Sequence, residues 1–552
     1  MASSKTWNRR LALAGGVALA AGAGAMALSS RRRHIHRTLV GPDTLLRGNA
    51  GEPETLDPSL ASDQPDAEII GDLMVGLFMP DPAARPYPAM ATSWTTSADG
   101  LTWIFHLRDA RWSDNTPITA QDFVFSWQRL VTPATASTYA YYLYPVKNAE
   151  PINAGKMAPE TLGVRALDDH TLEVHLENPA PYFPQMLMHQ TTSPLPRHVV
   201  KAKGAGWAQP GSYVGNGAFV LKEWVPNDHV LVEKNPLFYE ADKVRLRQVY
   251  FFPTNDYGAA LQRFRAGELD TQDKLPGQEI DWIRANIPQT ISNKPQLVTE
   301  IVAVNHRRKP FDDIRVREAI NLAINREALT DRIKRVGDVP AYNLVPPTTA
   351  NYPTGNSFDF KHLNQRQRLD KACALMRAVG FGENNRCKTT FLIRSTTAGS
   401  ERAIAAAIQQ MLAQIWLDIA IIPNDFQIFY PTIQVHDFDI AQSGWQADFN
   451  DAITFLNLLR SDSGDNWGLY NSPAYDAMLA GAQAEINLES RGQKLAAAER
   501  IALADQALMP LWFWNDSNLA WPYLSGWEAN PLDYHRSRWV SIDQRARITL
   551  FA

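Results

Sequence analysis

The length of the chain restricts its fold more than any other feature. A single hydrophobic core stops growing at roughly 250–300 residues, and this chain has 552 residues. After residue 40 no segment repeats at a fixed period, and no stretch has low complexity. The sequence therefore predicts two or more lobes.

Composition and charge are typical of soluble globular proteins. Apolar residues make up 45% of the chain and charged residues 20%. The 54 basic and 58 acidic residues give a formal net charge of -4. This balance provides neither a basic footprint for nucleic acid nor a polybasic patch for a membrane surface. We therefore expect no nucleic-acid partner, and we expect most of the 16 tryptophans to lie in the core.

The sequence lacks the signatures of common catalytic and metal sites. It contains no GxSxG, HExxH or P-loop motif. Cys373 and Cys387 belong to no CxxC motif or Cys/His cluster, so we expect no metal and no cofactor. The two cysteines form either one disulfide or two free thiols. A carboxylate pair for glycoside hydrolysis needs no fixed spacing, so a secreted hydrolase with a Trp-lined cleft stays open as the enzyme alternative.

Residues 1–40 have the layout of a secretory signal peptide followed by a short linker. A charged start precedes an uncharged, Ala/Gly/Leu-rich run at residues 11–28, which contains a small-x-small cleavage pattern. Arg9 and Arg10 resemble a twin-arginine signal. The alternative is an uncleaved anchor, but residues 31–33 would then place three arginines on the outer side of the membrane. We favour cleavage and export to the periplasm.

Helices and strands are mixed along the folded part. Thr119, with Asp122 three positions later, is typical of a helix start, and Phe123, Trp127 and Leu130 share one face of that helix. The remaining patterns predict strands at 102–107, 301–305, 438–442 (broken at Gly444) and 511–514, and helices around 316–324, 404–415 and 488–508.

An ordered series of motifs carries the most specific signal. It comprises LDP (56–58), ADGLTWIFHLR (98–108), ARWSD (110–114), DFVFSW (122–127), DDHT (168–171), NGA (216–218), EKNP (233–236), PFDDIRVR (310–317) and GWQADFN (444–450). Over roughly residues 45–540 the chain resembles the family that includes the periplasmic oligopeptide- and dipeptide-binding proteins, extracellular solute-binding protein family 5.

The resemblance implies an α/β, bilobal periplasmic-binding-protein fold of the type II-like class, with an extra inserted domain and a hinge between the lobes. The expected division, beginning after the signal peptide and linker (1–40), is lobe I at 41–74, 199–300 and 516–552, inserted domain II at 75–198, and lobe III at 301–515.

The same resemblance implies a site in which a peptide lies extended and pairs its backbone with the strand containing Ser443 to Gln446. Asp448 corresponds to a carboxylate that pairs with the peptide's α-ammonium, and Tyr139 to a tyrosine that touches its N-terminal part. Spacing alone favours a helix cap or a surface turn for Asp448, and core packing is the alternative for Tyr139. The other expected contacts are Gln442, Gly444, Trp445, Gln446, Arg308, Ser62, Asp63 and Gln64.

The end of the site that would meet the peptide's carboxylate departs from the family pattern. Gln442, Ile433 and Glu401 stand where basic residues are expected, and only Arg308 is basic near its expected place, with Arg307 or Lys309 as substitutes under a one-residue shift. Ser62 stands in place of an acidic contact, with Asp63 beside it. The ligand is then a peptide of one preferred length or with a modified C-terminus, such as a cell-wall peptide, or an amine-bearing non-peptide solute. We prefer the peptide.

These expectations describe a periplasmic solute-binding protein, not an enzyme. The resemblance implies a monomer that captures short peptides between two lobes and delivers them to an ABC permease and ATPase complex in the inner membrane. A sensor that uses the same clamp is the remaining alternative.

Overall fold

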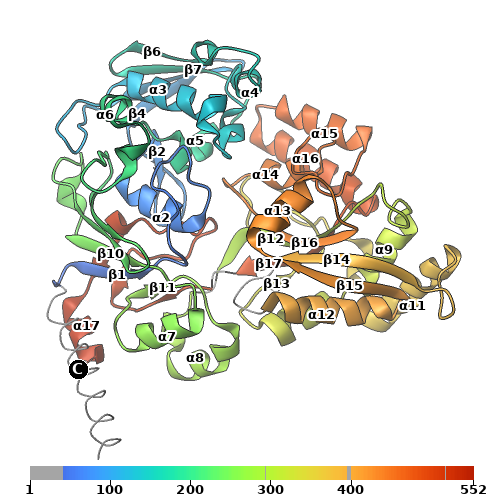
Figure 1. The fold of residues 1–552 in the computed structure, drawn as a ribbon. Coiled ribbons are helices and arrows are strands. Elements are labelled where there is room, and N and C mark those ends of the chain that lie inside the picture. Colours follow the sequence, from blue (N-terminus) through green and yellow to red (C-terminus); the bar gives the residue numbers. More distant parts are fainter. Residues whose placement is uncertain (1–40, 293, 395–399, 516, 552) are drawn as a thin grey trace, which may run out of the picture.

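The computed structural model describes residues 41–292, 294–394, 400–515 and 517–551. Figure 1 shows two bodies side by side, which we call the first and the second lobe. The first lobe contains a six-stranded sheet in the order β18-β11-β1-β10-β9-β8. Its strands are β1 (Thr44–Gly48), β8 (Phe219–Val225), β9 (His229–Lys234), β10 (Gln248–Phe252), β11 (Thr271–Gln272) and β18 (Leu519–Ala520).

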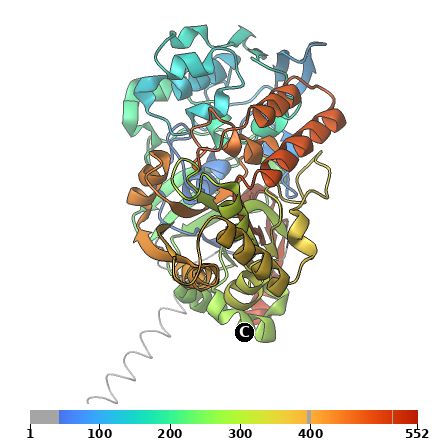
Figure 2. The ribbon, with the colours of Figure 1, turned by 90° about the vertical axis from the view of Figure 1, so that its right-hand side faces the viewer.

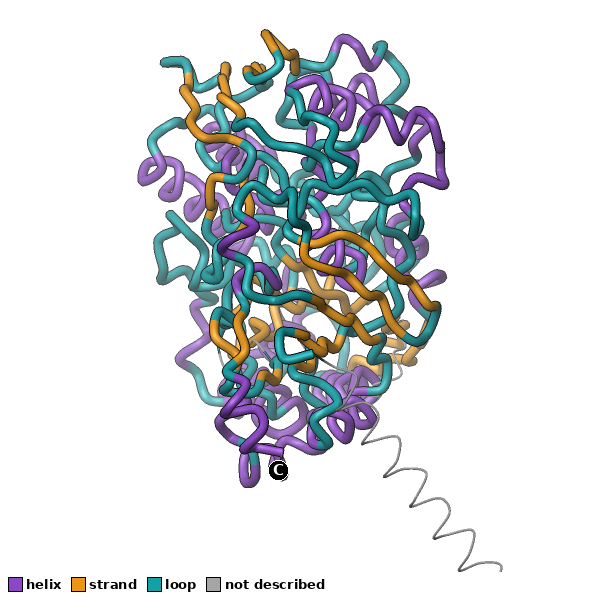
Figure 3. Tube along the Cα trace, turned by 90° about the vertical axis from the view of Figure 1, so that its left-hand side faces the viewer, coloured by secondary structure: helices purple, strands orange, loops and turns teal. Residues whose placement is uncertain are grey.

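A second, four-stranded sheet lies above the first in this lobe (Figure 3). It is antiparallel throughout, in the order β4 (Ala91–Thr96), β5 (Thr102–Leu107), β7 (Thr171–His175) and β6 (Val164–Asp168). Helix α3 (Ala120–Val131) packs on this domain and begins as predicted, because Thr119 and Asp122 form a capping box in which the Thr119 N–H donates to Asp122 Oδ2 at 2.9 Å.

The second lobe is built on a six-stranded mixed sheet in the order β13-β17-β12-β16-β14-β15. Helices α9 (Ile314–Ala323), α11 (Gln365–Ala378) and α12 (Ser400–Ala413) belong to this lobe, and α15 (Pro473–Gln483) and α16 (Leu488–Ala504) form a red hairpin that is prominent in Figure 2. Its strands are β12 (Pro295–Val304), β13 (Val339–Pro340), β14 (Cys387–Arg394), β15 (Leu417–Asn424), β16 (Ile440–Gln446) and β17 (Met509–Asn515).

The chain crosses between the lobes twice, along two neighbouring segments. Pro295 at the start of β12 pairs with Asn515 at the end of β17. On the first-lobe side, the Ser292 N–H donates to the Asn518 carbonyl at 3.1 Å. Two adjacent connections leave the lobes free to rotate about them, which is the layout of a hinge. The predicted two-lobed α/β fold is confirmed.

One local prediction was wrong, and three others differ from the structure only in their bounds. Strand β16 runs through Gly444 rather than breaking there, because a Cβ at this position would lie 3.0 Å from the Glu300 carboxylate, so glycine here permits a close approach. Strand β12 begins six residues earlier than expected, at Pro295. The helices expected at 404–415 and 488–508 end sooner, at Ala413 and Ala504.

The cysteine alternatives resolve to free thiols. Cys373 lies on α11 and donates its Sγ–H to the Gln414 carbonyl at 3.6 Å, whereas Cys387 is buried at the start of β14. The predicted signal segment at 1–40 lies outside the described residues.

Candidate ligand-binding site between the lobes

The two lobes touch where the chain leaves β16. Asp448 follows this strand by two residues, and its Oδ2 accepts a hydrogen bond at 3.2 Å from the hydroxyl of Tyr141, which lies in the first lobe. The hydroxyl of Tyr534, also in the first lobe, donates to the Asp448 carbonyl at 3.5 Å. Asp448 is therefore held between elements from three distant parts of the sequence.

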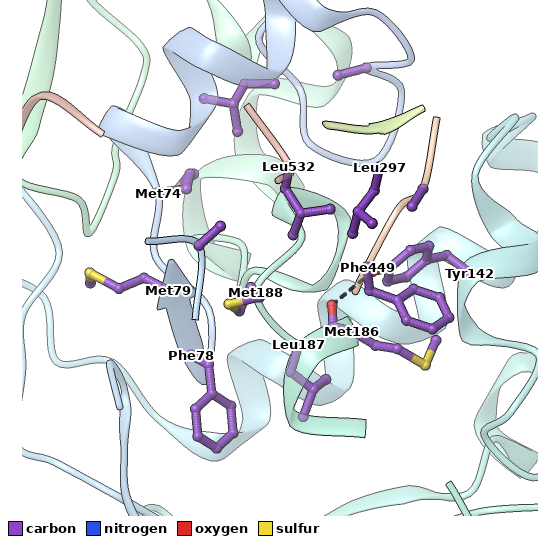
Figure 4. Packing of buried hydrophobic residues seen from close by; sticks show 14 of the residues in the cluster. Met74, Phe78, Met79, Tyr142, Met186, Leu187, Met188, Leu297, Phe449 and Leu532 are labelled. Carbon is purple, nitrogen blue, oxygen red and sulfur yellow. Dashed lines mark hydrogen bonds between the residues drawn. The ribbon is translucent and has the colours of Figure 1, made fainter. Parts of the chain in front are cut away.

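An aromatic contact closes one side of this junction. Phe449 stacks face to face on Tyr182 with ring centroids 5.2 Å apart, and meets the edge of Tyr142 at 6.1 Å. Figure 4 shows Phe449 beside Tyr142, whose hydroxyl donates to the Met186 carbonyl at 3.0 Å. These rings join the two lobes at the residue that follows Asp448 in the chain.

A buried ion pair fixes the loop that carries Asp448 and Phe449. The Arg491 guanidinium on α16 donates to both oxygens of Asp451, at 2.6 and 2.8 Å, and both side chains are 2% exposed. The same guanidinium lies 4.5 Å from the ring centre of Tyr182. Charge pairing and cation–π contact thus connect this loop to both lobes.

The carboxylate of Asp448 has an unusual electrostatic environment. The pKa of Asp448 is raised to about 7, because burial raises it strongly, the hydrogen bond from Tyr141 lowers it in part, and the nearby charge of Asp465 adds a smaller increase. Burial also raises the pKa of Asp465. Within the part of the chain that the structure describes, neither carboxylate forms an ion pair. A buried carboxylate without a counter-ion is costly, so this place is suited to a cation.

Strand β16 also offers an open edge beside Asp448. Alternate residues of an antiparallel strand bond to the same neighbour. The Ala447 N–H donates to Leu297 and the Asn305 N–H to Asp439, so the odd-numbered residues of β16 face β12. The N–H and C=O groups of the even-numbered residues therefore point to the β14 side.

On that side, the pairing with β14 ends early. It covers Phe391↔Ile440 and Leu392↔Ala441 only, while β14 stays paired with β15 as far as Arg394. Across the described ranges, no other strand covers Gly444 and Gln446. These backbone groups are available to an extended ligand.

Tyr139 and the loop before α2 (Gln64–Leu73) face the same junction. The Tyr139 ring stacks on His189 at 5.2 Å, and burial raises the pKa of its hydroxyl, as do the charges of Asp448 and Asp63. Asp63 occupies the N-cap position of α2 without a side-chain capping bond, and burial raises its pKa. Beside it, Ser62 is exposed, and Gln64 donates to Asp533 Oδ2 at 3.1 Å.

The structure does not bring Arg308 into this group. Its guanidinium pairs with Asp437 at 2.7 Å and Asp439 at 3.0 Å, next to the first residue of β16. Asp439 precedes Asp448 by nine residues, which is about 30 Å along an extended strand. The Gln442 side chain donates to Glu300 Oε1 at 2.9 Å, on the sheet face opposite to Trp445.

Three tryptophans of β16 and β17 differ in burial. Trp512 is 1% exposed and is a core residue. Trp514 is half-buried and donates its indole N–H to Glu300 Oε2 at 3.2 Å. Trp445 is half-buried, next to the open edge of β16, and donates to the Thr454 hydroxyl at 3.2 Å.

Sequence reasoning missed several residues of the junction. Tyr141 had a weak signal, because it belongs to the same tyrosine cluster as Tyr139. Phe449 is part of the GWQADFN motif but was not assigned a role. Asp465 and Arg394 carried no local signal, since only the tertiary fold brings them near the site.

The two lobes are joined by adjacent crossings, and an unpaired carboxylate and an open strand edge lie between them. This arrangement is that of a two-lobed ligand-binding protein. The chain belongs to the bacterial extracellular solute-binding proteins, family 5, whose family profile matches residues 85–467. The predicted family and bilobal periplasmic-binding-protein fold are thereby confirmed.

Individual relatives agree with this assignment. The periplasmic oligopeptide-binding protein OppA of Salmonella typhimurium is 36% identical over 90% of this chain and 92% of its own. The structure of the Escherichia coli murein tripeptide binding protein MppA superposes with a TM-score of 0.81 at 34% identity, over 90% of this chain and 98% of that one. Haemophilus influenzae OppA in complex with RPPGFSPFR superposes with a TM-score of 0.80 at 31% identity, over 91% and 99%.

Proposed function

We propose that this chain captures short peptides between its two lobes and delivers them to the membrane permease and ATPase of an ABC importer. The observation that carries the proposal is the unpaired carboxylate of Asp448 beside the open edge of β16. The carboxylate can bind the α-ammonium of a peptide, and the strand edge can form hydrogen bonds with the peptide backbone. The names of the relatives, which bind oligopeptides and a murein tripeptide, support the same ligand class.

The peptide adds to β16 as an extended strand. Its ammonium lies at Asp448, with the hydroxyls of Tyr139 and Tyr141 alongside, and its backbone bonds to Gly444 and Gln446. Backbone bonding does not depend on side chains, so the site accepts varied sequences. The first-lobe loop at Ser62, Asp63 and Gln64 closes over the ligand.

In this proposal the inserted domain comprises residues 75–198, and the second lobe, predicted at 301–515, begins earlier, with β12 at Pro295. The chain acts by binding alone, as a monomer, and residues 1–40 direct it to the periplasm. No helix in the described part is long and apolar enough to cross a membrane.

Native mass spectrometry of the protein purified from its own periplasm tests the proposal. We expect a retained series of short peptides, because an enclosed ligand leaves slowly. Calorimetry then measures the affinity of a peptide with a free N-terminus and of its N-acetyl form. Both are tested on wild type, on Asp448→Asn and on the control variant Asp109→Asn. The native Asp109 carboxylate is 99% exposed, so the control removes a surface charge.

Acetylation removes the positive charge of the ammonium. We therefore expect it to weaken peptide binding to wild type and to Asp109→Asn about 10- to 100-fold. Peptide binding to Asp448→Asn should be weakened much less, because that variant lacks the carboxylate that meets the ammonium. A retained non-peptide species with no affinity for peptides would contradict the ligand class. Turnover of any bound peptide would contradict a role in binding alone.

A further inference from the structure

Arg394 lies at the point where β14 and β16 separate. Extending their register from Leu392↔Ala441 places Arg394 level with Ser443. Leu392 and Ala441 belong to the core cluster that spans both lobes, whereas Phe391 belongs to the second lobe's own cluster. Because side chains alternate along a strand, Arg394 shares the sheet face of Leu392, Ser443 and Trp445.

The guanidinium of Arg394 has no close partner. Among the described residues, it forms no hydrogen bond or ion pair, although the residue is half-buried. Its charge nevertheless lowers the pKa of Asp63, which lies across the junction in the first lobe. Arg308, by contrast, already pairs with Asp437 and Asp439. Within the described ranges, Arg394 is thus an unpaired cation at a junction that also holds Asp63, Asp448 and Asp465.

The spacing along β16 limits the ligand that Arg394 and Asp448 can hold together. Asp448 lies five residues after Ser443, two of them beyond the end of β16, so the two residues are at most about 17 Å apart along the backbone. The long arginine and shorter aspartate side chains cover part of this span. A peptide of three residues, about 10 Å long, fills most of the rest.

We infer that Arg394 binds the C-terminal carboxylate of the peptide whose ammonium lies at Asp448, and that the pair selects peptides of about three residues. The inference rests on the proposed function and adds the residue that sets ligand length. The bound peptide runs antiparallel to β16, from Asp448 toward the fork between β14 and β16, and brings one opposite charge to each end of the site.

Calorimetry with alanine peptides of two to six residues, each as free acid and as C-terminal amide, tests this inference. We expect wild type to bind the tripeptide acid most tightly and its amide about 10- to 100-fold more weakly. Arg394→Gln binds acid and amide equally and shows a flatter dependence on length. Retained binding of the amide shows that the variant is folded.

Two matched variants separate Arg394 from its neighbours in sequence. Arg307→Gln removes an exposed arginine of the same lobe, and Arg308→Gln removes the paired one. Both should keep the preference for the free acid. If Arg394→Gln keeps that preference, or if either control loses it, the inference fails while the proposed function stands. If wild type binds none of the peptides, both fail.

Discussion

At the scale of single residues, the function depends on Asp448 being poorly solvated before the ligand arrives. Burial raises its pKa to about 7, and no cation among the described residues compensates it. An ammonium that binds there supplies the missing charge and lowers the pKa again. Binding and protonation at this site are therefore linked.

This linkage predicts proton release on binding. Near pH 6.5 the free carboxylate is largely protonated, so an ammonium ligand displaces a proton. Near pH 8.5 the carboxylate has no proton to release, and the mostly neutral amino group of the ligand takes up a proton on binding. Affinity should rise from pH 5 to about 7 and fall above about 8, where a peptide's α-amino group loses its proton. Calorimetry in buffers of different ionisation enthalpy measures the proton count.

Asp448→Asn should abolish this release, and Asp465→Asn should move its midpoint to lower pH, because a like charge is removed. Proton release that is unchanged in Asp448→Asn would assign the titration to another group.

The raised pKa also predicts a stability effect in the ligand-free protein. The folded state holds the Asp448 proton up to about pH 7, whereas the unfolded chain loses it near pH 4. The native state is therefore penalised increasingly from pH 4 to 7, and fully above pH 7.

Asp448→Asn removes this penalty, so it should stabilise the protein at pH 8 by on the order of 2 kcal/mol, after discounting for solvent screening. The gain should be small at pH 4.5. Thermal unfolding at both pH values measures it, and an equal shift at both would contradict the account.

At the scale of elements, the loop after β16 is positioned by its partner helix. Arg491 on α16 holds Asp451, and both are almost fully buried. Phe449, between Asp448 and this ion pair, packs on Tyr182 of the first lobe. The orientation of the Asp448 carboxylate thus depends on the packing of Phe449 and on the Asp451–Arg491 ion pair.

Arg491→Leu should therefore destabilise the fold strongly. It leaves Asp451 buried and unpaired, which costs about 3–5 kcal/mol. The double variant Arg491→Leu with Asp451→Asn should recover a large part of this loss, because no uncompensated charge remains. Urea unfolding of the two variants checks the difference; equal stability of the single and double variants would show that the ion pair is unimportant.

The elements that could be predicted from sequence are those with strong local patterns. The strand at 102–107 and the start of α3 match, because β-branched and aromatic residues and the Thr119–Asp122 box act locally. The break expected at Gly444 was wrong, because the reason for glycine there is the approach of Glu300 from a neighbouring strand. Asp448 was found through the family resemblance, whereas its contacts to Tyr141 and Tyr534 arise from residues 307 and 86 positions away.

At the scale of the whole molecule, the two adjacent crossings between the lobes favour a hinged clamp. The Tyr141–Asp448 bond is one of the contacts that span the junction. A ligand that bonds to both lobes shifts the population toward the closed form.

Small-angle X-ray scattering should therefore show a smaller radius of gyration when peptide is added. Asp448→Asn, at a peptide concentration that saturates wild type but not the variant, should remain more open. An unchanged scattering curve at full occupancy would contradict closure around the ligand.

The central claim is that a peptide lies extended along β16 with its ammonium at Asp448. A crystal structure of the protein with alanine tripeptide tests it most directly. We expect the peptide antiparallel to β16, bonded to the backbone of Gly444 and Gln446, with its ammonium about 3 Å from the Asp448 carboxylate. A peptide in the reverse direction, or bound away from β16, would contradict the account.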